Sequence, residues 1–207
     1  MKKIVSLLLV LVMALSVLTA CTGKPVETPT EAPTEAPTEA PTEAPTEAVN
    51  VPASAVEILE NIWALYKDEE KFPIGGGDPE NMTMDAPGNF DVAQAEGLSA
   101  MVHIPVEEIG TIDGAATMLH MMNANSFSSG AFHLAAGTDA ATFATMMQEA
   151  IKNTRWMCGF PEKLLITSIA DEYVVVAFGV TDLMDVFTAH LSEAYADAQV
   201  LVDEPIE

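Results

Sequence analysis

Three stretches of the chain carry apolar residues at the spacing of an amphipathic helix. The first begins at Ser54, which forms a capping box with Glu57, and extends to about Asp68. The second covers residues 139–153 and the third residues 181–195. One face of each helix is therefore expected to lie against a core. The apolar positions are Ala55, Ile58, Leu59, Ile62, Trp63 and Tyr66 in the first helix, Phe143, Met146, Met147, Ala150 and Ile151 in the second, and Met184, Phe187, Leu191 and Ala194 in the third.

Runs of apolar residues between and beside these helices predict strands. The predicted strands are residues 126–135, 163–169, 172–178 and 199–202. A tight turn at Ala170 and Asp171 joins the middle two strands as a hairpin. Residues 126–202 therefore follow the order β-α-β-β-α-β of a ferredoxin-like unit. We expect an α+β fold in which four antiparallel strands carry both helices on one face.

The segment before this unit has a less regular pattern. Residues 71–89 are rich in glycine and proline and predict a long loop. Residues 98–104 predict a strand that Pro105 ends, and residues 113–123 predict a second helix. Together with the helix that begins at Ser54, these elements form an N-terminal helix–strand–helix extension of the sheet.

Residues 1–20 predict a signal peptide. Lys2 and Lys3 precede an apolar run at residues 4–17, which is short for a membrane span and is followed by small residues. The next residue is Cys21, and this order is similar to the lipobox of bacterial lipoproteins. The resemblance implies that Cys21 becomes the mature N-terminus and carries a diacylglyceryl group, which anchors the chain to the membrane.

A repetitive linker follows the predicted anchor. Residues 29–48 are five tandem copies of Pro-Thr-Glu-Ala. Proline at every fourth position disfavours a helix, and nothing in the repeat can form a core. Residues 21–50 are therefore expected to be an extended, lipid-anchored linker. Residues 51–207 have the length of a single globular domain.

The composition is strongly acidic. The whole chain has a formal net charge of −23, and residues 51–207 contain 25 acidic and five basic residues, which gives −20. Such a surface repels nucleic acid and anionic lipid headgroups. The simplest interpretation is that the charge keeps an extracellular domain soluble. If the charge indicates a partner, that partner is a cation: a metal ion, a basic peptide or a basic patch on another protein.

The cysteine content limits thiol chemistry. If Cys21 is acylated, Cys158 is the one remaining thiol, so neither an internal disulfide nor a cysteine-based zinc site is expected. Residues 156–161 combine Trp, Cys, Gly and Pro as thioredoxin-like sites do, but Pro161 replaces the second cysteine. We expect a small buried cysteine at Cys158, and a redox thiol is the alternative.

Two groups of side chains are candidate metal ligands. Asp78, Glu80 and Asp85 occupy the glycine-rich loop, where carboxylate oxygens suit calcium although their spacing differs from that of an EF-hand. His120 and Met121 offer an imidazole and a thioether, which suit Cu(I), whereas the neighbouring methionines are expected to pack in the core. The chain contains no nucleophile elbow and no phosphate-binding glycine loop, so neither an enzymatic activity nor a cofactor is expected.

Several short motifs occur together in residues 54–207. They are Ile62-Trp63, Lys71-Phe72-Pro73, Gly76-Gly77-Asp78, residues 121–125, residues 156–161 and Asp203-Glu204-Pro205. In this combination the chain resembles uncharacterised surface lipoproteins of anaerobic, clostridial-type Gram-positive bacteria, some of which are labelled bacteriocin transport accessory proteins. The resemblance implies no catalytic residue.

We therefore expect a lipoprotein tethered to the extracellular side of the cell membrane, with a non-enzymatic binding or accessory domain. Besides the membrane, a cationic peptide or an envelope protein is the expected partner, and nucleic acid is not. One alternative is an extracytoplasmic protein that binds calcium or copper. The other, implied by the resemblance, is a thiol-redox accessory protein in bacteriocin export.

Overall fold

The computed structural model describes residues 51–206. The predicted signal peptide, Cys21 and the linker lie outside the described residues. The helices are α1 (Ala55–Ala64), α2 (Ala95–Val102), α3 (Ala140–Lys152) and α4 (Thr181–Ala194), with 3-10 helices at Val106–Thr111 and Ala124–Ser126. The strands are β1 (Ile74–Gly76), β2 (Thr83–Met84), β3 (Gly88–Phe90), β4 (Ile112–His120), β5 (Phe127–Leu134), β6 (Lys163–Ile169), β7 (Tyr173–Gly179) and β8 (Gln199–Pro205). Among these residues no helix has both the length and the apolar character that crossing a membrane requires.

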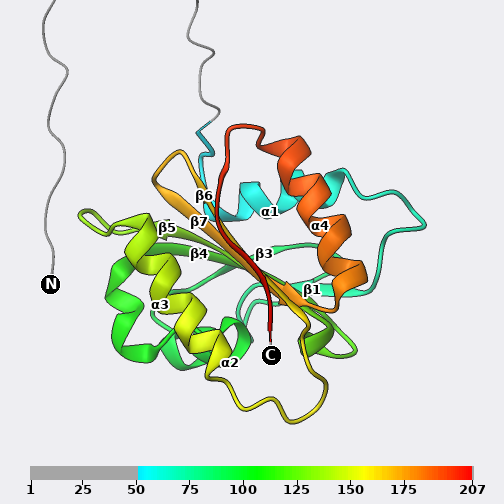
Figure 1. Ribbon diagram of the computed structural model, residues 1–207, viewed down its shortest axis with the longest axis horizontal. Helices are drawn as coiled ribbons and strands as arrows, with labels where there is room; N and C mark the ends of the chain where they lie inside the picture. Colours follow the sequence, from blue (N-terminus) through cyan, green and yellow to red (C-terminus); the bar gives the residue numbers. More distant parts are fainter. Residues whose placement is uncertain (1–50, 207) are drawn as a thin grey trace, which may run out of the picture. The chain divides into compact units, whose positions relative to one another are not determined.

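The eight strands form one open sheet. Their order is β2-β1-β4-β5-β7-β6-β8, and β3 pairs with β4 on the same side as β1. Every pair is antiparallel. The predicted α+β class, the antiparallel sheet and the β-α-β-β-α-β order of residues 126–202 are confirmed. Figure 1 shows the sheet running through the centre of the molecule, with helices packed against it.

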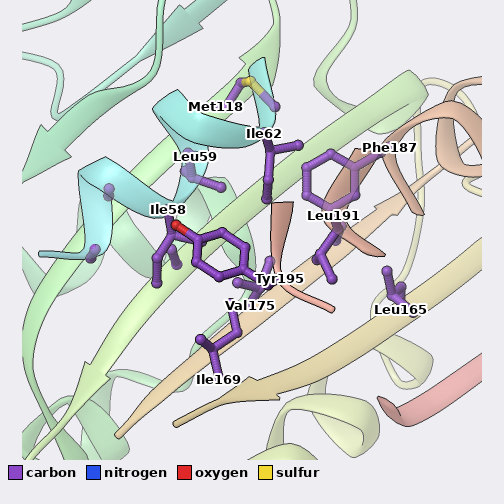
Figure 2. Close-up of a cluster of buried hydrophobic side chains, with 14 of the residues drawn as sticks. Ile58, Leu59, Ile62, Met118, Leu165, Ile169, Val175, Phe187, Leu191 and Tyr195 are labelled. Carbon is purple, nitrogen blue, oxygen red and sulfur yellow. The ribbon is translucent and has the colours of Figure 1, made fainter. Parts of the chain in front are cut away.

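The prediction that both helices pack on one face is wrong, because α3 and α4 cover opposite faces of the sheet. Phe187 of α4 packs in a core that includes Leu165 of β6. Phe143 of α3 packs in a second core that includes the preceding residue, Leu164. Successive residues of β6 point to opposite faces, as they do in any strand. Figure 2 shows the first core, where α1 and α4 lie over the sheet.

The position of the last strand explains why the helices separate. In a ferredoxin-like sheet β8 would lie beside β5, but β4 pairs with that side of β5 and β8 pairs with β6. The β5-α3-β6 connection and the β7-α4-β8 connection therefore both move towards the β8 edge of the sheet. Their first strands, β5 and β7, are antiparallel to each other. Because such connections are right-handed, they place their helices on opposite faces.

Burial on both faces also explains the composition of the central strands. All seven residues of β7 are buried, as are six of the seven in β6. A strand covered on one face alternates apolar and polar residues, whereas a strand covered on both is continuously apolar. The uninterrupted apolar run from Tyr173 to Phe178 is the sequence signal of two covered faces.

Two elements differ from the prediction. Residues 98–104 were expected to form a strand, but they overlap α2, whose Leu98 and Val102 lie one turn apart and are both buried. Residues 113–123 were expected to form a helix, but most of them belong to β4. The alanine, methionine and leucine of this segment favour a helix locally, and pairing with β5 and β1 on the two sides overrides that preference.

The hairpin and helices α3 and α4 agree with the prediction, whereas α1 ends at Ala64, about four residues before its predicted end. Ser54 caps α1 by accepting a hydrogen bond from the Glu57 N–H (3.3 Å). Helices α3 and α4 lie within a residue of the predicted bounds. Ala170 and Asp171 have φ of 53° and 57°, the left-handed backbone that a tight hairpin turn requires. The predicted loop at residues 71–89 contains the short strands β1, β2 and part of β3.

Candidate functional site

The β1–β2 hairpin lies beside the last residues of β4. Gly75 pairs with Leu119 of β4 on one side and with Met84 of β2 on the other. The Met121 N–H donates to the carbonyl of Pro73 (2.9 Å), which continues the pairing one residue beyond β4. The backbone of the hairpin is thus fixed to the sheet on both sides of Gly75.

A contact between two glycines holds the hairpin close to β3. A Cβ at Gly76 would overlap backbone atoms of Gly88 and lie 2.5 Å from the carbonyl oxygen of Thr117, so only glycine fits. Gly77 follows with φ of 90°. Its N–H donates to the Thr117 hydroxyl (2.9 Å), which in turn donates to the Gly77 carbonyl (3.1 Å). The glycines of Gly75-Gly76-Gly77 therefore allow the hairpin to pack closely against β3 and β4, and we do not assign them to phosphate binding.

Two methionine side chains meet above Gly75, and a third is directed to the same face. A Cβ at Gly75 would overlap the Met121 sulfur and lie 3.4 Å from the Met82 sulfur. Met84 is directly opposite Gly75 in the hairpin, and opposite residues in an antiparallel pair direct their side chains to the same face. The missing side chain of Gly75 leaves the space that the methionines occupy.

The turn after β4 connects these methionines to the α3–β6 loop at residues 153–162. Met122 lies in this turn, and the Asn125 side-chain amide donates to the carbonyls of Cys158 and Gly159 (both 3.2 Å). Gly159 has φ of 104°, and a Cβ there would lie 2.8 Å from the Asn123 amide nitrogen. The two segments are therefore in direct contact; in Figure 1 the loop is the yellow segment between α3 and β6.

Both ends of the α3–β6 loop are anchored. At its start, the Trp156 ring packs against His103 and Phe178, with centroid distances of 4.9 and 5.4 Å. At its end, the Glu162 N–H donates to the carbonyl of Gly179 (2.8 Å), and the Glu162 carboxylate accepts from both the N–H and the hydroxyl of Thr181. The hydrogen bonds from the Thr181 N–H and then its hydroxyl lower the pKa of Glu162. The loop thus presents Met157, Cys158 and Phe160 to solvent between its anchors.

The hairpin, the turn after β4 and the α3–β6 loop together carry an exposed apolar surface, which we call the methionine surface. Its residues are Met82, Met84, Met121, Met122, Met157 and Phe160, with exposed fractions between 41% and 82%. These are six of the nine large apolar side chains that are exposed among the described residues. Large exposed apolar patches are characteristic of interaction sites. The methionine surface is therefore the candidate functional site.

The structure separates the predicted copper ligands His120 and Met121. The His120 ring stacks on Phe72 (5.2 Å between centroids, 13° between planes), and Phe72 packs against the core under α1 and α4. His120 Nδ1 accepts the backbone N–H groups of Met122 (3.1 Å) and Asn123 (3.4 Å). Met121 points to Gly75 instead. His120 shapes the turn, and the methionine that accompanies Met121 is Met82.

The predicted calcium ligands also have different environments. Asp78 is 3% exposed, and its carboxylate accepts the N–H groups of Glu80 (2.9 Å) and Asn81 (3.0 Å). Burial opposes its ionisation, but hydrogen bonds from Gln94, Glu80 and Asn81 outweigh burial and lower the pKa of Asp78. Glu80 and Asp85 are exposed. Within residues 51–206, no three His, Cys, Asp or Glu side chains gather as metal ligands.

Cys158 is exposed, so the prediction that it is a small buried cysteine is wrong. The neighbouring Trp156 is the residue that fills the core at this point, and the chain then turns outward through Met157 to the left-handed backbone of Gly159. The thiol lies within the loop that carries Met157 and Phe160. Pro161, at the position of a second cysteine, is buried.

A second, smaller site lies at the N-terminal end of α1. His133 Nδ1 contacts the Asp113 carboxylate, and both residues line a hollow of about 290 Å³ together with Tyr173 and Ser54. Burial, and then the charges of nearby carboxylates, raise the pKa of the Tyr173 hydroxyl. A histidine oriented by a carboxylate is the general-base pair of many hydrolases. However, the serine that lines this hollow, Ser54, is the N-cap of α1, and we assign it no role as a nucleophile.

A third polar cluster is buried under α4. His190 is 8% exposed, and its Nε2 lies 3.0 Å from the Glu70 carboxylate, while its ring packs on Tyr66 (4.7 Å between centroids). A hydrogen bond from the Lys67 N–H, followed by that from His190, holds the pKa of Glu70 at about 2. Burial raises the pKa of Tyr66. The cluster joins the segment after α1 to α4 and has the features of a structural ion pair.

One feature of the sequence indicates the methionine surface, although it did not enter the predictions above. Met82 and Met84 alternate with Thr83 between glycine-rich segments, where no helix or long strand was predicted to bury them. Comparison of the chain with protein-family models, with curated proteins and with solved structures finds no match in any of the three. The function must therefore be inferred from the geometry.

Proposed function

We propose that this protein is a lipoprotein, anchored through Cys21 to the extracellular side of the membrane, whose non-enzymatic domain binds a basic, amphipathic peptide segment on the methionine surface. The observation that carries the proposal is the gathering of six exposed apolar side chains on three adjoining segments. The predicted linker supports it, because an extended spacer would hold the domain away from the membrane.

Methionine suits a surface that must accept different peptides. Its unbranched side chain has three rotatable bonds and a polarizable sulfur, so a methionine surface can adjust to the shape of a partner. Proteins that recognise many amphipathic helices use such surfaces. Here the adaptable side chains lie on a hairpin and a loop whose backbones are fixed by hydrogen bonds.

The charge of the domain selects a basic partner. Four of the five basic residues in residues 51–206 are already in ion pairs with acidic side chains: Lys67, Lys71, Lys152 and Lys163. Glu80 and Asp85 are exposed on the same hairpin that carries Met82 and Met84. A peptide with an apolar face and flanking lysines or arginines complements both features, and the long-range field accelerates its association.

The test is a calorimetric titration of residues 22–207 with a designed Leu/Lys amphipathic helix. The matched Leu/Glu helix serves as the control for charge. We expect the basic peptide to bind and the acidic one not to bind, with an affinity that falls as salt is added. Equal binding of both peptides, or of neither, would overturn the proposal.

A pair of variants locates the site. Met84 is 58% exposed and Val200 of β8 is 57% exposed. Burying about half of a methionine contributes roughly 0.7–1.5 kcal/mol, so Met84→Gln should weaken binding about three- to tenfold. Val200→Gln removes a similarly exposed apolar side chain from a different strand and should leave the affinity unchanged. Equal effects of the two substitutions would place the binding elsewhere.

A further inference from the structure

The three methionines above Gly75 offer a second, more specific chemistry. The Met82 and Met121 sulfurs approach the same point, because a Cβ at Gly75 would lie 3.4 Å from the first and overlap the second. The two sulfurs are therefore no more than about 6 Å apart. Met84 is directly opposite the same glycine. Three thioethers can thus reach one point without any change of the backbone.

Thioethers discriminate strongly between metals. They are soft ligands that favour Cu(I), whereas carboxylates and carbonyls favour calcium and magnesium. The floor of the site is Gly75 and the nearly buried Leu119, which pairs with it and directs its side chain to the same face. The floor below the sulfurs is therefore apolar.

We propose that Met82, Met84 and Met121 form a Cu(I)-binding site above Gly75. This inference goes beyond peptide docking, because it depends on the sulfur atoms and not on apolar area. It also differs from the pairing expected from sequence, since the histidine next to Met121 points away and the other ligands come from the hairpin. The glycine is part of the site, because its missing Cβ leaves the space that the thioethers share.

The first experiment uses residues 22–207 labelled with ¹³C at the methionine methyl groups, which gives ten methyl resonances. Ag(I) replaces Cu(I), because it prefers the same soft ligands and is stable in air. We expect saturable shifts at one equivalent, confined mainly to the resonances of Met82, Met84 and Met121. Equal shifts of Met122 and Met157, which are more exposed, would show non-specific binding and overturn the proposal.

The second experiment measures Cu(I) affinity without oxygen, by competition with a chromophoric Cu(I) chelator. Met82→Leu, Met84→Leu and Met121→Leu each remove a sulfur and keep an apolar side chain of similar size. Each should weaken Cu(I) binding by at least about tenfold. The matched controls Met122→Leu and Met157→Leu should bind as the parent does. Unchanged affinity in all three site variants would refute the site.

Gly75→Ala tests the shared space. The atoms nearest the added Cβ belong to the flexible ends of methionine side chains, so the variant should fold. It should nevertheless lose Cu(I) affinity, because the Met121 sulfur must move. The basic peptide is then titrated against the leucine variants. They should retain peptide binding. The Cu(I) site and the peptide-binding surface can therefore each be refuted without the other.

Discussion

The close contact between Gly76 and Gly88 gives the sharpest test of how the candidate site is built. In Gly76→Ala the new Cβ would overlap the Gly88 backbone and lie 2.5 Å from backbone atoms of Pro87 and Thr117. Inserting one methyl group into a well-packed site typically costs about 1–3 kcal/mol, and more where the neighbours cannot move. Since all three neighbours are backbone, we expect a loss of about 3 kcal/mol in the free energy of unfolding.

Two other glycines provide matched controls. At Gly75 the same substitution meets flexible methionine side chains, so we expect a loss below about 1 kcal/mol. At Gly110 nothing lies within 4 Å, and the change should stay within about 0.5 kcal/mol. Equilibrium unfolding in urea, followed by tryptophan fluorescence, measures all three variants. If Gly76→Ala were no less stable than Gly75→Ala, the glycine contact would not hold the hairpin in place.

Three further predictions concern the cores, the ion pair and the thiol. Phe187→Ala should reduce the free energy of unfolding in urea by about 3–5 kcal/mol, because Phe187 is completely buried between α4 and the sheet; a loss under about 1 kcal/mol would contradict that packing. The hydrogen bonds from Lys67 and then His190 lower the pKa of Glu70 from 4.5 to about 2, so the stability that they contribute is present above pH 4.5 and is lost as the pH falls towards 2. The urea midpoint should therefore fall less between pH 5 and pH 3 in Glu70→Gln than in the parent, and parallel falls would refute the pairing. Cys158 should react with iodoacetamide in the native protein about as fast as the unfolded chain does, and strong protection would show that the thiol is covered.

Local sequence patterns correctly predict the elements whose structure depends mainly on residues nearby in the chain. Helices α1 and α3 have side-chain caps, all of α1, α3 and α4 have regular apolar stripes, and the β6–β7 hairpin has its turn residues. Segments whose structure depends on distant partners are predicted badly. The segment at Ala115 and Ala116 reads as a helix, and becomes a central strand because β5 pairs with it on one side and β3 on the other.

The candidate site was hidden from sequence reasoning for the same reason. Met118 and Met122 read as core residues, and Met118 is indeed fully buried, but the prediction for Met122 is wrong because it is 81% exposed. The chain turns towards the hairpin after β4, and the residue that Met121 meets there, Met82, is far away in the sequence. The pairing of His120 with Met121 used chain neighbours, whereas strand geometry brings together residues that are distant in the chain.

The two outer strands of the sheet bear on the proposed peptide binding. An open sheet ends in edge strands, whose free N–H and C=O groups can recruit another strand. At one edge, β2 has only two residues. At the other, β8 has an irregular register with β6 opposite Ile166 and Thr167, and it ends in Asp203, Glu204 and Pro205. Shortness, bulges, charge and proline are the features that prevent edge-to-edge association. Growth of the sheet across a second molecule is thus opposed at both ends, and the peptide binding that we propose rests on side chains and not on strand addition.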